Sequence, residues 1–82
     1  MNNQRKFDSV YQEARKKLKH LPISALNEII KYHGKVQLAM DIDEELRGVM
    51  NGISNSQNEY LPGFSSPEYK AARSLRKEKI LV

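Results

Sequence analysis

The side chains of this sequence that could hold a metal ion or transfer a proton are two histidines and a short acidic run. His20 and His33 are the only histidines, and the chain contains no cysteine. Neither histidine has a second imidazole or a thiolate at the spacing of a zinc site. The acidic run, residues 41–45, lacks the glycine turn and alternating oxygen ligands of a calcium loop. We therefore expect no metal and no cofactor, and we interpret both histidines as helix-end residues.

Covalent catalysis and phosphate binding have no motif either. No serine lies in a G-x-S-x-G nucleophile turn, and the four glycines are isolated rather than gathered in a phosphate-binding loop. At 82 residues the chain can also bury only a limited core. We therefore predict a protein that is not an enzyme and that acts by binding.

Positively charged side chains are the remaining candidates for function. The chain carries 14 Lys and Arg against 10 Asp and Glu, a net charge of +4, and the cations crowd both ends of the sequence. Such clusters attract acidic protein faces or phosphates. The candidate binding residues combine these cations with two aromatic residues: Lys16, Lys17, Lys19, Tyr60, Phe64, Lys70, Arg73, Arg76 and Lys77.

Two kinds of partner fit this composition. In the first hypothesis the protein is a small adaptor or inhibitor that binds another protein through an apolar and charged helical surface. In the alternative it is a nucleic-acid-binding regulator that uses its basic terminal helices, and a steep fall of affinity with salt would favour this. The sequence specifies neither the identity of the partner nor the oligomeric state.

One segment is loosely similar to the helix-turn-helix repressors of bacterial viruses. Residues 29–52 contain a helical pattern, Gly34, a second helical pattern with Ala39, and a final Asn51-Gly52. Such motifs have a short turn, often with glycine, ahead of the recognition helix. The corresponding residues, 41–44, contain no glycine and three acids. The resemblance therefore does not place the chain in that family.

The spacing of apolar residues predicts an all-α protein, because they recur in steps of three and four. The first helix is expected over residues 4–19, with residues 1–6 as a frayed N-terminus, and Pro22 prevents its continuation. Two further helices are expected at 23–33 and 35–51, since the apolar positions before and after Gly34 lie on roughly opposite sides of a single helix. Gly34 would then have a positive φ. One long kinked helix is the alternative.

The spacing of apolar residues and the turn-forming residues also predict the core and the elements of the second half of the chain. Residues 53–65 are expected to form a loop whose Tyr60, Leu61 and Phe64 pack over the helices or contact a partner. A basic helix then starts at Ser65 or Ser66, with Pro67 in its first turn, and covers residues 66–82. The side chains expected to be buried together are Leu18, Leu26, Ile30, Met40, Leu46 and Val49.

The expected architecture is a single domain, residues 1–82, made of a small bundle of three packed helices plus a loosely attached basic C-terminal helix. That helix has a thin apolar stripe, so it is expected either to dock lightly or to order on binding. No apolar run has the length of a membrane span, and the first residues lack the apolar block of a signal peptide. The expected location is the cytoplasm, with no membrane partner.

Overall fold

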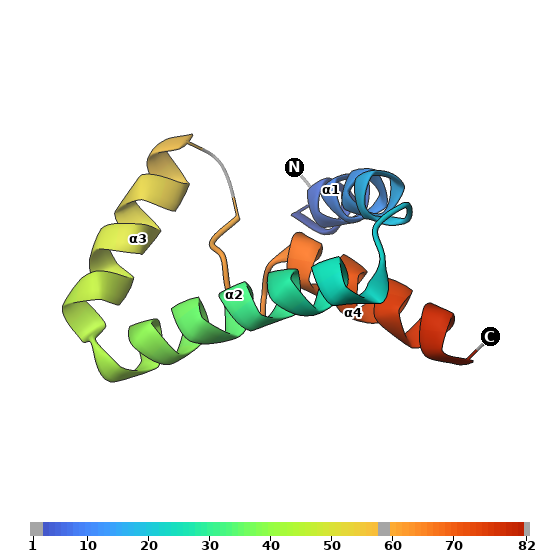
Figure 1. Cartoon of the computed structure of the whole chain (residues 1–82). Coiled ribbons are helices and arrows are strands. Elements are labelled where there is room, and N and C mark those ends of the chain that lie inside the picture. The colour runs from blue at the N-terminus through green and yellow to red at the C-terminus, as the bar shows by residue number, and fades with distance from the viewer. Residues whose placement is uncertain (1–2, 58–59, 82) are drawn as a thin grey trace.

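The computed structural model describes residues 3–57 and 60–81, and these residues form four helices and no strand. The helices are α1 (Asn3–Leu18), α2 (Ile23–Ile42), α3 (Glu44–Gln57) and α4 (Pro67–Leu81), as Figure 1 shows. Helices α1, α2 and α4 share one core, while α3 has its main helix contact with α2. The predicted all-α class is confirmed. The predicted frayed N-terminus is wrong from residue 3 onward, and residues 1–2 lie outside the described part.

The core is centred on α4. Leu26, Ala72 and Leu75 are buried together, and half-buried side chains from α1, α2 and the turn between them pack around them: Leu18, Leu21, Ile29 and Ile30. Ala71 and Ala72 are completely buried. Small alanine side chains let the backbones of neighbouring helices approach closely, so α4 needs no broad apolar stripe to pack well. The predicted loose attachment of the C-terminal helix is therefore wrong, because α4 is one of the three packed helices and α3 is the peripheral one.

Helix α4 begins as the sequence predicts from Ser66 and Pro67. Both residues are buried, and the Ser66 Oγ accepts a hydrogen bond from the Glu68 N–H at 3.2 Å. Pro67 occupies the first helical position, where its missing N–H leaves no hydrogen bond unmade. The capping interaction fixes the point at which the chain turns from the preceding loop into the core helix.

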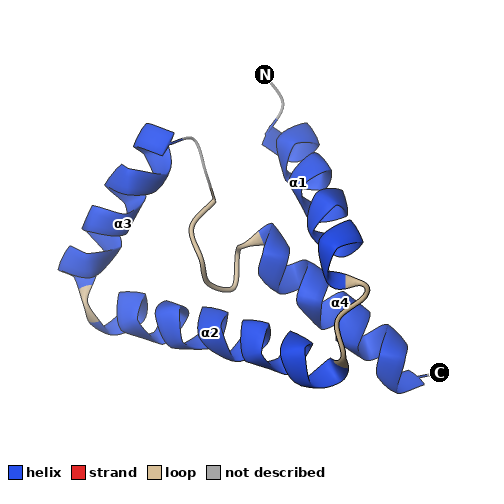
Figure 2. Ribbon diagram, turned by 45° about the horizontal axis from the view of Figure 1, so that its top comes forward, coloured by secondary structure: helices blue, strands red, loops and turns tan. Residues whose placement is uncertain are grey.

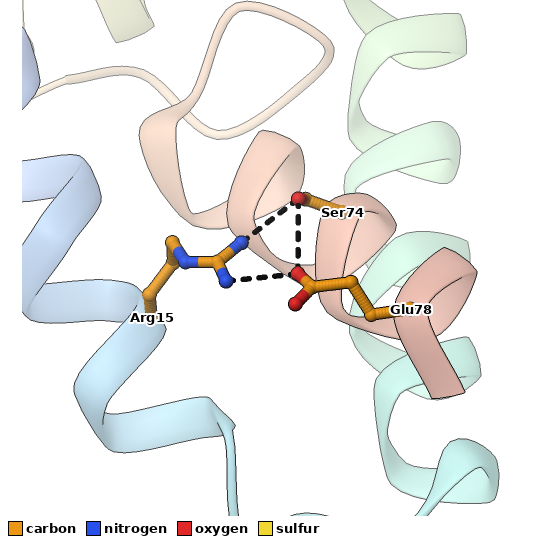
Figure 3. Close-up of polar contacts among 3 residues, drawn as sticks. All are labelled: Arg15, Ser74 and Glu78. Atoms are coloured by element: carbon orange, nitrogen blue, oxygen red, sulfur yellow. Dashed lines mark hydrogen bonds and ion pairs between the residues drawn. The ribbon is translucent and has the colours of Figure 1, made fainter. Parts of the chain in front are cut away.

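A polar cluster joins α1 to α4 (Figure 3). The Arg15 guanidinium donates hydrogen bonds of 2.8 Å to the Ser74 Oγ and to the Glu78 carboxylate. The bond to Glu78 raises the pKa of Arg15, and the hydrogen bond with Ser74 lowers the pKa of Tyr11 one turn earlier on α1. These contacts hold α1 across α4 and give the carboxylate of Glu78 a partner on α1.

Helix α2 runs without a break through Gly34, so the predicted helices 23–33 and 35–51 are wrong. Among the described glycines a positive φ occurs at Gly63 and not at Gly34. Leu26, His33 and Met40 are the buried residues of α2. Their spacing of seven residues, close to two helical turns, places them on one face. The positions that suggested a break include Leu46, Val49 and Met50, which belong to α3, so they do not interrupt the buried face of α2.

The real break in the middle of the chain is Asp43. It has an extended backbone, with φ −117° and ψ 101°, between the end of α2 and the start of α3. Its Oδ1 accepts a hydrogen bond from the Leu46 N–H at 3.2 Å, which caps the first turn of α3. An aspartate in the acidic run thus has a structural role. The single-residue joint also differs from the turn of a helix-turn-helix motif.

Helix α3 extends to Gln57, so the predicted loop 53–65 is wrong for its first five residues. Residues 58–59 lie outside the described part, and residues 60–66 form the loop ahead of α4. Figure 2 shows α3 projecting from the end of α2, apart from α1 and α4. Val49 is 60% exposed, which contradicts its predicted place in the core. Leu46 is half-buried and lies outside the core shared by α1, α2 and α4, so its predicted place in that core is also wrong.

The molecule is flat and has a large surface for its mass. Its Cα radius of gyration is 13.6 Å, against about 12 Å for a typical domain of this length. The Cα extents are 41 × 32 × 15 Å, so the helices lie close to a single layer. The accessible surface is 6066 Å², roughly 1,000 Å² more than a folded monomer of this mass usually exposes.

Candidate functional site

An open groove of about 740 Å³ follows the outer face of α4. It is lined by eight residues of α4 and by one from the loop ahead of it: Phe64, Tyr69, Lys70, Arg73, Ser74, Arg76, Lys77, Ile80 and Leu81. Five of these residues are candidates that the sequence predicted: Phe64, Lys70, Arg73, Arg76 and Lys77. The fold therefore brings the C-terminal candidates together on one surface, which we call the α4 groove.

The α4 groove is positively charged and contains no carboxylate among its lining residues. The two acids of α4 bond to other helices: Glu68 bonds to His33 of α2, and Glu78 bonds to Arg15 of α1. Glu78 also accepts a hydrogen bond of 3.5 Å from Ser74, which lines the groove. In the part of the chain that the structure describes, none of the four cations in the groove forms an ion pair. The packing of α4 thus separates its charges, with acids held toward neighbouring helices and cations left outward.

Arg76, Lys70 and Arg73 contact neutral groups, and these contacts do not neutralise their positive charge. Arg76 donates a hydrogen bond of 3.0 Å to the neutral side-chain oxygen of Asn27. The Lys70 ammonium lies 5.1 Å from the centre of the Phe7 ring, and the Arg73 guanidinium lies 5.7 Å from the centre of the Tyr69 ring. Cation–π contacts of this kind orient a side chain without neutralising it. The groove therefore keeps its positive charge available to an incoming group.

Apolar side chains line the same groove. Phe64 is 50% exposed, and its ring packs against Tyr69 with 5.0 Å between ring centres. At the C-terminal end of the groove Ile80 and Leu81 are 62% and 73% exposed. The surface therefore combines cations with uncovered aromatic and aliphatic groups, which suits a ligand that has both carboxylates or phosphates and apolar parts.

The loop that presents Phe64 is held by two polar side chains of α2. The Gly63 N–H donates to the His33 Nδ1 at 2.9 Å, and the Phe64 N–H donates to the Gln37 Oε1 at 3.1 Å. Because Nδ1 accepts this bond it carries no proton, so the protonated Nε2 of His33 donates to the Glu68 carboxylate at 3.1 Å. His33 is 3% exposed. It joins the loop, α2 and α4, and its interpretation as a helix-end residue is wrong.

Sequence reasoning missed the positioning role of His33 and Gln37. The signal that could have revealed it is the seven-residue spacing of Leu26, His33 and Met40, which places a histidine on a buried helix face. A buried polar side chain requires hydrogen-bond partners, and the nearby glycine-containing loop supplies backbone N–H groups. The loop sequence alone does not show which of its N–H groups bind.

The other candidate residues lie outside the groove. Lys16, Lys17 and Lys19 are exposed in the last turn of α1 and the residue after it. Tyr60 is half-buried, with its ring edge-on to Phe7 at 5.8 Å. These positions remain predictions for partner contact. The α1 lysines offer a second basic surface against which the α4 groove can be compared.

A metal-dependent site receives no support from the structure. Across residues 3–57 and 60–81, no three His, Asp or Glu side chains are grouped in a way that could hold a metal ion. Asp41, in the acidic run, instead accepts hydrogen bonds from Arg47 at 2.8 Å and from Gln37 at 2.9 Å. Within the same described ranges, no helix combines the length and the apolar character required to span a bilayer.

Comparisons with known proteins add no functional information. No protein-family model, no curated protein and no solved structure matches the chain. The function must therefore be argued from the surface itself.

Proposed function

We propose that the protein is a small non-enzymatic adaptor or inhibitor that binds an acidic, partly apolar segment of another protein in the α4 groove. The observation that carries this proposal is the set of four cations that form no ion pair with any described residue, beside the exposed Phe64, Ile80 and Leu81. A segment with carboxylates and apolar side chains would satisfy both parts of this surface. Its carboxylates would meet the cations and its apolar groups would cover the exposed rings and aliphatic chains.

The length of the groove limits the size of the bound segment. Helix α4 spans 15 residues, which corresponds to about 22 Å at the helical rise. A helical segment of about 14 residues or an extended one of about 7 would cover this distance. A partner of this kind is a helix or a tail of a larger protein, and the proposal does not require the partner to fold around the whole molecule.

Nucleic acid is the second candidate, and one observation favours it. Phe64 and Tyr69 lie beside Arg73, and exposed aromatic rings next to cations are where unpaired bases stack. Against it, Ile80 and Leu81 would face a polar sugar-phosphate backbone at one end of the groove. Surfaces that bind nucleic acid are more polar and more positively charged than those that bind protein. A protein partner therefore accounts for more of the groove.

A pair of charge-reversal variants tests the proposal with a matched control. The first variant is R73E/R76E/K77E in the groove, and the control is K16E/K17E/K19E, which changes the net charge equally on α1. Each protein serves as bait in a nuclease-treated lysate, with quantitative mass spectrometry of captured proteins. Each is also titrated with an amphipathic Glu/Leu peptide, its Gln/Leu analogue and a DNA oligonucleotide.

The proposal expects protein capture and Glu/Leu peptide binding by the wild type and by the α1 control. Binding by the groove variant should be weaker by about tenfold or more, since several exposed charge pairs are lost and replaced by repulsion. Equal peptide affinity for all three proteins would remove the groove from the binding site. Tight DNA binding with a steep salt dependence, lost in the groove variant, would replace this proposal by the nucleic-acid alternative.

A further inference from the structure

Helix α3 carries an apolar stripe that the monomer leaves largely uncovered. Leu46, Val49, Met50 and Ile53 recur in steps of three and four, so they share one face of the helix. Leu46 and Met50 are half-buried, while Val49 and Ile53 are 60% and 53% exposed. Figures 1 and 2 both show α3 standing apart from α1 and α4. Within residues 3–57 and 60–81, neither α1 nor α4 therefore lies opposite the stripe.

A shallow apolar hollow lies beside this stripe. Met50 and Ile53 of α3 border it together with Tyr60, Leu61 and Pro62 of the following loop, and its volume is about 110 Å³. Ser54 also borders the hollow, but most of its wall is apolar, so an aliphatic side chain from outside can enter it. The stripe and the hollow together form an uneven apolar surface suited to a packed interface.

The charge of this surface is compatible with a second copy of the chain. In α3, residues 48–57 contain no ionisable side chain. A two-fold interface places the same patch of both copies face to face, so it accommodates no concentration of like charge. The α4 groove, with four cations, would repel its own copy. Of the two exposed apolar surfaces described, the face of α3 is the one that can pack against itself.

The exposed area agrees with an interface of ordinary size. The chain exposes 6066 Å², an excess of roughly 1,000 Å² over a typical monomer of its mass. Each partner in a stable protein interface buries about 800 Å². One such interface would bring the exposed surface close to the value expected for a compact protein.

We propose that the apolar stripe of α3 is the interface of a two-fold homodimer, with Val49 and Ile53 of one copy packed against α3 of the other. This interface is separate from the α4 groove and does not rest on the proposed function. The interface follows from the peripheral position of α3. This helix is amphipathic, and the other described helices leave its apolar side largely exposed.

Sedimentation velocity of the full chain over a wide range of concentration tests the proposal. The wild type should sediment as a dimer, and V49D and I53D should each raise the dimer dissociation constant by about thirtyfold or more, as expected for a central interface residue. The control is I80D, since Ile80 on α4 is 62% exposed and carries the same change. It should leave dimerisation unchanged while weakening peptide binding in the groove.

A cross-link gives a readout that does not depend on a destabilised variant. Because the chain has no cysteine, single I53C and I80C variants can be oxidised, and I53C should form disulfide-linked dimers much faster than I80C. A wild type that stays monomeric at every concentration would overturn the proposal, and so would a dimer unaffected by V49D and I53D. The R73E/R76E/K77E variant should remain dimeric, so loss of the groove function and loss of the dimer are separable results.

Discussion

Replacing Gly63 by alanine tests how the loop that presents Phe64 is held. Gly63 has a φ of 125°, which L residues rarely adopt, and a Cβ there would lie 2.8 Å from the Gln37 Oε1 and 3.2 Å from the Met40 methyl carbon. The backbone conformation alone costs a residue with a Cβ on the order of 1–3 kcal/mol. Displacing Gln37 would also weaken its bond from the Phe64 N–H, a further loss of about 1 kcal/mol. The free energy of unfolding should therefore fall by about 2–4 kcal/mol.

That loss is large for a chain of this size. An 82-residue domain has a stability of about 4–12 kcal/mol. One kcal/mol corresponds to about 4–8 °C in Tm for such domains, so G63A should lower the Tm by roughly 10–25 °C. The measurement is a circular dichroism melt with a urea titration, in which the m value should not change if the native fold is retained.

The matched control is G34A, for which the expected sign is opposite. Gly34 lies inside α2, and a Cβ would meet the Phe64 Cε1 at 3.9 Å, an ordinary contact distance. Alanine in a helix interior is more stable than glycine by about 0.5–1 kcal/mol, so the Tm should rise by a few degrees. A G63A protein that melts with the wild type would refute the loop geometry. A G34A protein that melts lower would refute the continuous α2.

Two further substitutions follow from the burial of individual side chains. L26A should cost about 2–5 kcal/mol because Leu26 is fully buried against Ala72 and Leu75, whereas L46A, at a half-buried position of the peripheral α3, should cost clearly less in the same urea titration. H33L should cost about 1–3 kcal/mol, because the Gly63 N–H is left buried without its acceptor. Hydrogen exchange of the Gly63 amide should speed up in that variant, and unchanged protection would contradict the assigned bond.

The sequence predicted the helical class well because the amphipathic period of α1 and the Ser66-Pro67 start of α4 are local signals. The errors come from features that only tertiary structure defines. In α2, the apparent change of face came largely from apolar positions after Asp43, which belong to the separate helix α3. In α4, the stripe of Tyr69, Ala72 and Leu75 looked too thin to pack strongly, because the pattern does not show that Ala71 and Ala72 are completely buried.

The candidate groove was partly predictable for a different reason. Lysine and arginine remain exposed in almost any fold, so the cations of α4 could be named without knowing their neighbours. The bonding partners of the two acids in α4 could not be predicted in the same way. Glu68 bonds to His33 across 35 positions of sequence, and Glu78 bonds to Arg15 across 63. These bonds decide which charges remain outward. The exposed charge of a segment therefore depends less on its net charge than on the partners to which its carboxylates bond.

The two proposed surfaces together make a further prediction about avidity. Helix α3 and the C-terminal end of α4 lie at opposite ends of the molecule (Figure 1), so a dimer through α3 would carry two α4 grooves far apart. On a surface densely coated with Glu/Leu peptide, two linked sites should retain the dimer about a hundredfold longer than a single site. The V49D variant should lose this gain and yet bind the soluble peptide with the affinity of the wild type. Equal loss in both assays would show instead that α3 and the groove belong to one binding surface.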